Sequence, residues 1–149
     1  VGGGGLIAGI ASAVAALKPE VRVIGVEPAG APKLARALAA GHPVRLEHTE
    51  SLADGLLPLS IGELPFKVLS GLVREAVQVS EDEIVAGLRF LHQAGLAAEP
   101  SGAVTTAAVL AGRVDLGGPT VAVVSGGNAD PALLQRLLQV PSPGQDLTS

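Results

Sequence analysis

The stretch Val1-Gly2-Gly3-Gly4-Gly5-Leu6 places four consecutive glycines directly ahead of the apolar run IAGIASAVAAL at 7–17. Large apolar residues then recur at helical spacing, which predicts a helix over 5–17: Leu6, Ile7, Ile10, Val14 and Leu17. Glycine loses more conformational freedom on folding than any other residue and brings no side chain to pack. Such a run therefore indicates either a flexible linker or a backbone geometry that other residues cannot adopt.

A glycine turn that leads into a helix is a favourable place for a phosphate. The N–H groups of the first helical turn have no partner inside the helix, and the helix dipole adds a partial positive charge. Flexible linkers are typically rich in Gly and Ser with polar flanks, whereas this run leads straight into LIAGIASAV. The run therefore predicts an anion site at Gly2, Gly3, Gly4 and Gly5.

Neither of two known phosphate motifs fits this run. A P-loop requires the triplet GK[ST], which does not occur in the sequence. The dinucleotide fingerprint G-x-G-x-x-G would need a glycine where Ile7 or Ala8 stands. Glu27, at the end of the next predicted strand, nevertheless resembles the acid that binds ribose in dinucleotide folds. A nicotinamide-binding domain therefore remains an alternative.

Outward from the glycine run, helical and strand patterns alternate along the chain. Apolar periodicity and stop residues predict helices at 32–41, 63–73, 80–94, 101–111 and 130–139. β-Branched apolar runs predict strands at 21–28, 75–80 and 118–128, and 41–62 reads as mostly loop. Ser80 and Glu83 form the capping-box pattern S-x-x-E. This alternation predicts an α/β fold with a mainly parallel sheet flanked by helices.

Composition excludes several classes of function. The 149 residues suit one domain, and 48% of them are hydrophobic. Phe66 and Phe90 are the only aromatic residues, and the net charge is −4, so a nucleic-acid partner is not expected. The lack of cysteine excludes disulfides and thiolate sites. Without a secretory signal or a membrane-spanning run, a cytoplasmic protein with no membrane partner is expected.

Three further stretches carry polar groups in apolar settings. Ser125 ends the strand-like run VAVVSGGN at 121–128, where the carboxyl ends of parallel strands form ligand crevices. An ordinary turn after a strand would favour Gly and Asn there equally well. Glu99 lies in AAEPSGA at 97–103 and is either a site carboxylate or an acid at a helix N-terminus. Asp54 and Gly55 form a turn within SLADGL at 51–56.

Taken in order, GGGGLIAGIASAVAALKPEVRVIGVEP, SLADGL, AAEPSGA and VVSGGN resemble the fold-type II pyridoxal-phosphate enzymes. The resemblance is to the threonine/serine dehydratase and serine racemase branch and covers residues 1 to about 131. It implies that 1–140 are the C-terminal part of the large, cofactor-binding domain and that 141–149 are a tail. It also implies roles in binding pyridoxal 5'-phosphate: the phosphate on Gly2–Gly5, the pyridine nitrogen on Ser125, and the pocket wall at Asp54, Gly55 and Glu99.

The activity that the resemblance implies is a dehydratase reaction. Such an L-threonine/L-serine ammonia-lyase eliminates the β-hydroxyl group and yields a 2-oxo acid and ammonia, as in isoleucine biosynthesis. Serine racemase-like or hydroxyaspartate dehydratase activity, or a non-catalytic binding module, are the alternatives. Family members are usually homodimers. The family's Schiff-base lysine is expected before Val1, since Lys18, Lys33 and Lys67 do not match it and suit solvated surface positions.

The resemblance also raises the question of a mono- or divalent cation. Relatives in the racemase branch bind a cation through a glutamate, a backbone carbonyl and a second acid, and Glu27 and Ala31 match the first two positions. The third position is Lys33, which carries a positive charge where a hard cation would need an oxygen ligand. Either water completes the site or the Lys33 ammonium takes that place. Glu27 could equally face a helix N-terminus, and no histidine has ligand spacing.

Overall fold

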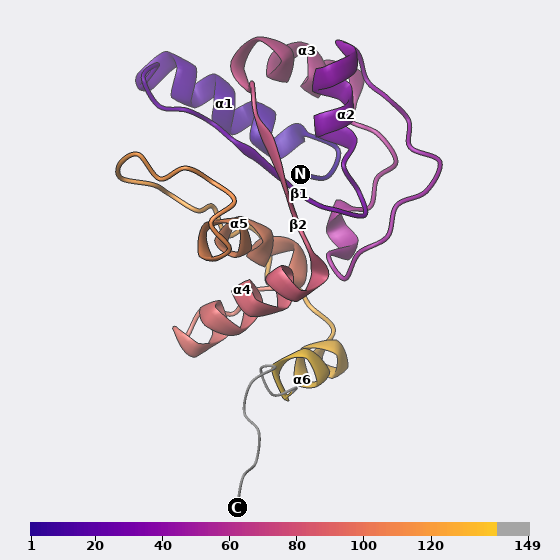
Figure 1. Ribbon diagram of the computed structural model, residues 1–149, viewed down its shortest axis with the longest axis vertical. Coiled ribbons are helices and arrows are strands. Elements are labelled where there is room, and N and C mark those ends of the chain that lie inside the picture. The colour runs from indigo at the N-terminus through magenta and orange to yellow at the C-terminus, as the bar shows by residue number, and fades with distance from the viewer. Residues whose placement is uncertain (140–149) are drawn as a thin grey trace, which may run out of the picture.

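The computed structural model describes residues 1–139 of the chain, and the expected tail at 141–149 lies outside them (Figure 1). The helices and the first two strands occur in the order that the sequence predicts, and one short 3-10 helix, η1, is added within the expected loop. Their bounds, in chain order, are α1 (Gly5–Leu17), β1 (Gly25–Pro28), α2 (Lys33–Ala40), η1 (Asp54–Leu56), α3 (Glu63–Leu72), β2 (Ala76–Val79), α4 (Glu81–Gln93), α5 (Pro100–Leu110) and α6 (Pro131–Gln139).

The sheet of the described residues consists of β1 and β2, which run parallel. Gly25 pairs with Ala76 and Pro28 with Val79. In Figure 1, α1, α2 and α3 lie together in the upper half of the molecule, and α4 and α5 lie in the lower half. Val26 of β1 packs with α4 and α5, whereas Ala76 of β2 packs with the helices above. Alternate strand residues thus serve two separate cores, as expected for a sheet with helices on both faces.

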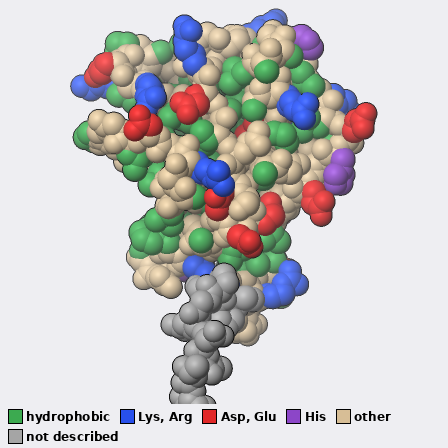
Figure 2. All heavy atoms as spheres, in the orientation of Figure 1, with side chains coloured by type: hydrophobic (Ala, Val, Ile, Leu, Met, Phe, Trp, Pro, Cys, Tyr) green, Lys and Arg blue, Asp and Glu red, His purple; other side chains and the backbone are tan. Residues whose placement is uncertain are grey.

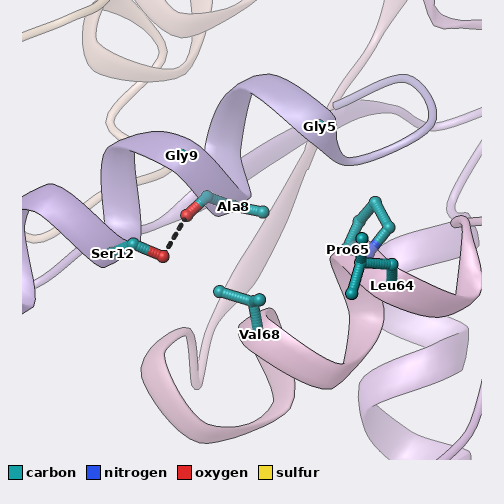
Figure 3. A pocket seen from close by; sticks show the side chains of 7 residues that line it. All are labelled: Gly5, Ala8, Gly9, Ser12, Leu64, Pro65 and Val68. Carbon is teal, nitrogen blue, oxygen red and sulfur yellow. Dashed lines mark hydrogen bonds between the residues drawn. The ribbon is translucent and has the colours of Figure 1, made fainter.

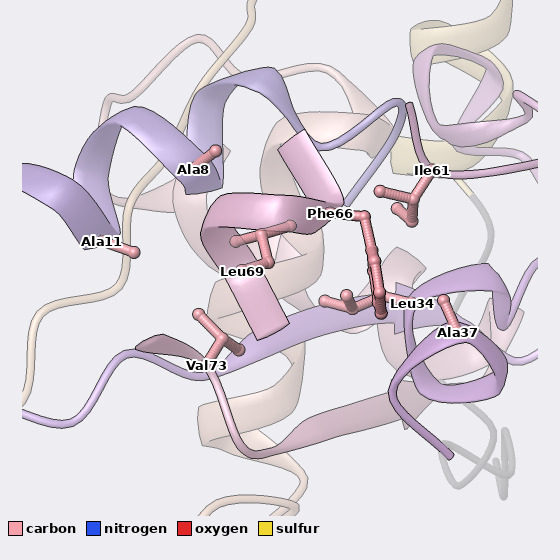
Figure 4. Packing of buried hydrophobic residues seen from close by; sticks show 8 residues of the cluster. All are labelled: Ala8, Ala11, Leu34, Ala37, Ile61, Phe66, Leu69 and Val73. Carbon is pink, nitrogen blue, oxygen red and sulfur yellow. The ribbon is translucent and has the colours of Figure 1, made fainter. Parts of the chain in front are cut away.

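The upper core joins α1, α2 and α3 (Figure 4). Small side chains, Ala8 and Ala11, lie on the face of α1 that is turned towards α3. Leu34 of α2 and Phe66 and Leu69 of α3 supply the bulk, and each is at most 5% exposed. This core holds the N-terminal end of α1, and with it the glycine run, against α3.

Local capping signals confirm several predicted boundaries. The Ser80 hydroxyl accepts a hydrogen bond from the Glu83 amide, and the Glu83 carboxylate accepts one from the Ser80 amide. This is the predicted capping box at the start of α4. Gly41 ends α2 with φ 75°, a left-handed conformation that glycine adopts without steric cost.

The predicted strand at 118–128 is wrong for the described residues. Residues 118–128 run without strand or helix assignment, and Val121 is 87% exposed. A strand needs a neighbour that completes its hydrogen-bond ladder, and this run pairs with neither β1 nor β2. The segment is instead attached to α5, because the Thr105 hydroxyl donates to the Val123 carbonyl over 2.9 Å. The first predicted strand is likewise shorter and begins at Gly25.

Charged side chains are distributed over the molecular surface. Figure 2 shows acidic and basic side chains interspersed over one face of the molecule. Among residues 1–139, no helix is both long enough and apolar enough to cross a membrane.

Candidate functional site

A cavity of about 1050 Å³ opens between the N-terminal end of α1, the residues leading into β1, the helix α5 and the segment 114–125. It brings together residues from four of the stretches that the sequence singles out. All of the predicted cofactor residues except Asp54 line it: Gly2, Gly3, Gly4, Gly5, Gly55, Glu99 and Ser125. Residues nearly 125 positions apart in the chain therefore share one cavity.

The glycine run forms a fixed turn at one end of this cavity. Gly4 is buried, precedes the first residue of α1 and has φ 94°. A Cβ atom there would come within 3.0 Å of Pro65 and 3.1 Å of Ile61. The Gly3 carbonyl also accepts a hydrogen bond from the Gly62 amide over 3.0 Å. The turn is therefore held by α3 and is not a flexible linker.

The remaining glycines of the run differ in their surroundings. A Cβ atom on Gly2 would lie 2.9 Å from the Gly55 carbonyl, so Gly2 closes one side of the turn. Cβ atoms on Gly3 and Gly5 would meet nothing within 4 Å, although both residues line the cavity. Open space thus lies beside Gly3 and Gly5, next to the unpaired N–H groups of the first helical turn. This space and these donors fit a phosphate group.

Ser101 is a site residue that the sequence analysis did not select. It lies in the first turn of α5, is 7% exposed and lines the cavity. Its hydroxyl accepts from the Gly55 amide over 3.0 Å and donates to the Asp54 carboxylate over 3.4 Å. Asp54 itself is exposed and accepts a second bond from the Gly55 amide over 2.8 Å. Asp54, the first residue of η1, therefore hydrogen-bonds within that turn and does not line the cavity. Ser101 connects η1 to α5.

Glu99 organises the turn that follows Ser125. Its carboxylate accepts a hydrogen bond from the Asn128 amide over 2.8 Å, and its own amide donates to the Gly126 carbonyl over 3.2 Å. Gly126 has φ 110°, and a Cβ atom there would lie 2.4 Å from Glu99 Oε1. Glu99 precedes α5, but its side chain makes no cap hydrogen bond. The carboxylate thus fixes the position of the turn, and with it Ser125 at the cavity wall.

The expected cation position is filled by the protein itself. Lys33 was expected on the surface, but its side chain is 0% exposed, so that expectation is wrong. The ammonium donates to the carbonyls of Ala31 over 3.0 Å and Leu56 over 2.8 Å and lies 3.8 Å from Glu27 Oε1. Ala31 and Glu27 are the two residues that matched the family's cation site. A cation there would meet an ammonium group instead of free oxygen ligands, so these residues do not fit it.

The Glu27 carboxylate has further partners of its own. It accepts hydrogen bonds from the amides of Leu34 over 2.7 Å and Ala35 over 3.0 Å, in the first turn of α2. It is therefore a strand-end acid that faces a helix N-terminus. Burial raises the pKa of Glu27, and the two amides and Lys33 oppose that shift. Burial lowers the pKa of Lys33, and Glu27 opposes that shift in turn.

The other candidate features of the described residues lack a set of free polar groups directed at a common point. A shallow hollow of about 240 Å³ lies between α1 and α3 (Figure 3). Its one lining hydroxyl, on Ser12, already donates to the Ala8 carbonyl over 2.9 Å. His42 and His48 are exposed, whereas His92 is half-buried and hydrogen-bonds the Ala98 carbonyl over 2.9 Å. Within the described part of the chain, no three His, Cys, Asp or Glu residues gather as metal ligands do.

The chain is similar in sequence and in structure to known proteins. Residues 1–126 match the family described as "Pyridoxal-phosphate dependent enzyme". The L-threonine ammonia-lyase of Thermotoga maritima is 42% identical over 140 residues, which are 93% of this chain and 35% of that protein. The L-threonine ammonia-lyase of Geobacter sulfurreducens is 47% identical over 132 residues, 87% of this chain and 33% of that protein. The chain therefore spans about a third of the length of these curated relatives.

Solved structures agree with this comparison. The crystal structure of a threonine deaminase from T.th. superposes with a TM-score of 0.84 at 42% identity, over 87% of this chain and 47% of that one. Maize serine racemase gives a TM-score of 0.79 at 35% identity, over 91% of this chain and 43% of that one. The α/β fold with a parallel sheet flanked by helices is thus that of the fold-type II enzymes. Since the family match extends over most of the sequence, the chain belongs to the family of pyridoxal-phosphate dependent enzymes.

Proposed function

We propose that this chain is the cofactor-binding, C-terminal portion of a pyridoxal-phosphate dependent ammonia-lyase that acts on L-threonine or L-serine. The single observation that carries the proposal is the cavity that places the glycine turn and Ser125 in its walls. The names and identities of the curated relatives support the choice of reaction. The products would be a 2-oxo acid and ammonia.

The glycine turn would hold the cofactor's phosphate. Gly3 and Gly5 leave room for close approach, and the first turn of α1 supplies N–H donors and the positive end of the helix dipole. Gly4 holds the turn in place against Pro65 and Ile61. The phosphate would therefore be bound by main chain that is already ordered.

Ser125 would orient the other end of the cofactor. When bound, pyridoxal phosphate supplies an electron sink for the charge that develops at the α-carbon of the substrate. The Ser125 hydroxyl can donate a hydrogen bond to the pyridine nitrogen without transferring its proton, whereas a carboxylic acid there would favour the charged ring. Glu99 would keep Ser125 in position through the Asn128 amide. A neutral ring is a milder sink, which suits prompt loss of the β-hydroxyl group.

The test uses the full-length protein with added pyridoxal phosphate. We expect a visible absorption band that borohydride removes, and conversion of L-threonine to 2-oxobutanoate. Ser125→Asp should alter the band and slow the reaction, because it changes the protonation of the ring nitrogen. Saturable NADH binding without such a band would contradict the proposal. That dinucleotide alternative finds little support, because the Glu27 carboxylate is buried and bonded to α2.

A racemase-like activity is the second candidate. The fold and 35% identity shared with maize serine racemase favour it over hydroxyaspartate dehydratase activity. Incubation with L-serine, followed by chiral analysis, would separate D-serine formation from pyruvate formation.

We also propose that the full-length protein is a homodimer, as the family resemblance implies, and that it is cytoplasmic. Sedimentation of the full-length protein tests the dimer, and cell fractionation tests the location. A monomeric sedimentation coefficient would contradict the first expectation.

A further inference from the structure

Lys33 is a buried cation at a junction of three chain segments. It is the first residue of α2, its side chain is 0% exposed, and its ammonium contacts oxygen atoms of three other residues. The Ala31 carbonyl, at 3.0 Å, comes from the turn after β1, and the Leu56 carbonyl, at 2.8 Å, comes from η1. Glu27, at 3.8 Å, comes from β1 and adds the opposite charge.

Burial of an ammonium group costs hydration free energy, a penalty that an apolar side chain in the same place would not have. An ammonium removed from water is strongly destabilising unless an opposite charge and hydrogen-bond acceptors compensate for its lost hydration. Here the ammonium donates hydrogen bonds to two carbonyls, and the Glu27 carboxylate, at 3.8 Å, supplies the opposite charge. A buried ion pair is weak evidence for added stability. The burial of Lys33 is better explained by the chain segments that its ammonium holds together.

The Leu56 carbonyl links Lys33 to the wall of the cavity. Leu56 directly follows Gly55, whose amide donates to Ser101 and whose carbonyl lies against Gly2. Gly55 and Leu56 both line the cavity. The Lys33 ammonium therefore connects β1 and α2 to the segment that touches the glycine turn on one side and α5 on the other.

We propose that Lys33 is a tethered cation: its ammonium takes the place of a free metal ion between Glu27, Ala31 and Leu56 and positions η1 against the cofactor cavity. The protein then needs no added mono- or divalent cation for this purpose. Lys33 is a positioning residue, since it acts on the cavity through η1. The inference rests on the proposed function only where its tests measure pyridoxal-phosphate binding. The melting temperature tests it independently of that function.

The first test compares cations on the unmodified full-length protein. After treatment with a chelator, the melting temperature and the affinity for pyridoxal phosphate are measured with potassium, ammonium or magnesium chloride. Tetramethylammonium chloride at equal ionic strength is the control. We expect no difference between these salts. A specific rise in melting temperature or affinity with any of the three cations would overturn the inference.

The second test removes the ammonium. Lys33→Ala should lower the melting temperature and weaken pyridoxal-phosphate binding about tenfold, the scale typical of losing a residue that orients a site. Potassium or ammonium, which match the size of the lost group, should restore much of both. Lys67→Ala, at an exposed lysine of α3, is the matched control and should change neither. A loss that no cation restores would indicate packing alone and overturn the inference.

A third variant covers the case in which Lys33→Ala does not fold. Lys33→Met keeps most of the side-chain volume and removes the charge. We expect weaker cofactor binding and a lower melting temperature, because Glu27 is left without its buried partner. Unchanged values for both would overturn the inference. If the full-length protein binds no pyridoxal phosphate at all, the proposed function fails, while the melting data still decide the role of Lys33.

Discussion

The glycines of the opening run perform different tasks although they are identical in sequence. Position 4 favours glycine for two reasons: its φ of 94° lies in the left-handed region, and a Cβ atom would lie only 3.0 Å from Pro65 and 3.1 Å from Ile61. Gly3 and Gly5 have open space where a Cβ atom would be. Folding therefore explains Gly4, whereas the proposed phosphate site would explain Gly3 and Gly5.

This difference predicts opposite effects on stability and binding at one position. Gly5→Ala should stabilise the full-length protein by about 0.5–1 kcal/mol, since alanine favours the helix and meets nothing within 4 Å. The same methyl group should weaken pyridoxal-phosphate binding, because it fills the space beside the helix N-terminus. Thermal unfolding and fluorescence titration measure the two effects.

Gly9→Ala is the matched control for Gly5→Ala. Gly9 lies on the same helix with nothing within 4 Å of a Cβ atom, but it does not line the large cavity. It should give the same gain in stability and leave the affinity unchanged. Equal affinities for both variants would show that the glycine turn does not hold the phosphate.

At the scale of elements, α4 and α5 approach each other closely at Gly87. Gly87 of α4 lies against the main chain of α5, where a Cβ atom would come within 2.8 Å of the Ala107 amide nitrogen and 3.0 Å of the Ala103 carbonyl oxygen. Backbone atoms cannot move aside as a flexible side chain can. The position of α5, and of Glu99 and Ser101 at its start, therefore depends on this close approach.

Gly87→Ala should separate α4 from α5. We expect a loss of about 1–3 kcal/mol in the free energy of unfolding, the usual cost of overpacking, despite the better helix propensity of alanine. Gly71→Ala in α3 is the control, since its Cβ atom meets nothing within 4 Å and it should stabilise slightly. Urea unfolding of the full-length protein measures both. A stabilised Gly87→Ala variant would contradict the close packing.

The start of α4 predicts a dependence on acidic pH. Burial would raise the pKa of Glu83, but hydrogen bonds from Arg113 and the Ser80 amide outweigh burial and hold it below its ordinary value of 4.5. A carboxyl group with a lowered pKa stabilises the fold above pH 4.5, and this stabilisation is lost as pH falls through the lowered value. Arg113 makes two hydrogen bonds to Glu83 Oε1, at 2.9 and 2.6 Å.

Arg113→Gln should therefore reduce stability at neutral pH and make it less sensitive to acid below pH 4.5. The loss should be no more than about 1 kcal/mol, because Arg113 is half-exposed and solvent screens the pair. Unfolding curves of the full-length protein between neutral and acidic pH would measure it. Parallel pH profiles for the variant and the parent would contradict the assignment.

At this scale, the sequence predicts well the features that depend on contacts between neighbouring residues. The helix at 5–17 and the capping box at Ser80 depend on residues within a few positions of one another, and both are confirmed. The burial of Lys33 depends on a carbonyl 23 positions away, and the role of Ser101 depends on an amide 46 positions away. The run at 118–128 reads as a strand because its residues suit one, but a strand also needs a partner ladder. Periodicity cannot supply any of these contacts.

At the scale of the whole molecule, the cavity is also an apolar groove. Large apolar side chains line it from α1, from 21–24 and from the segment after α5, and several are well exposed: Leu6 is 59%, Val21 51% and Val121 87% exposed. The described sheet has two strands, which alone is marginally stable in water. Both features leave apolar surface and strand edges in contact with solvent.

Residues 1–149 produced alone should therefore lack a unique packed state. We expect near-native helix content by circular dichroism, strong binding of the dye ANS, a broad thermal transition and a tendency to aggregate, as for molten globules. The full-length protein, measured in parallel, should bind less dye and melt cooperatively. The helices would persist because their hydrogen bonds join residues only four positions apart and do not need fixed tertiary packing. Val121 and its neighbours in the groove, in contrast, have too few apolar partners to fix them. A sharp cooperative melt of a soluble 1–149 monomer would mean that the two-stranded sheet and its cores suffice for folding.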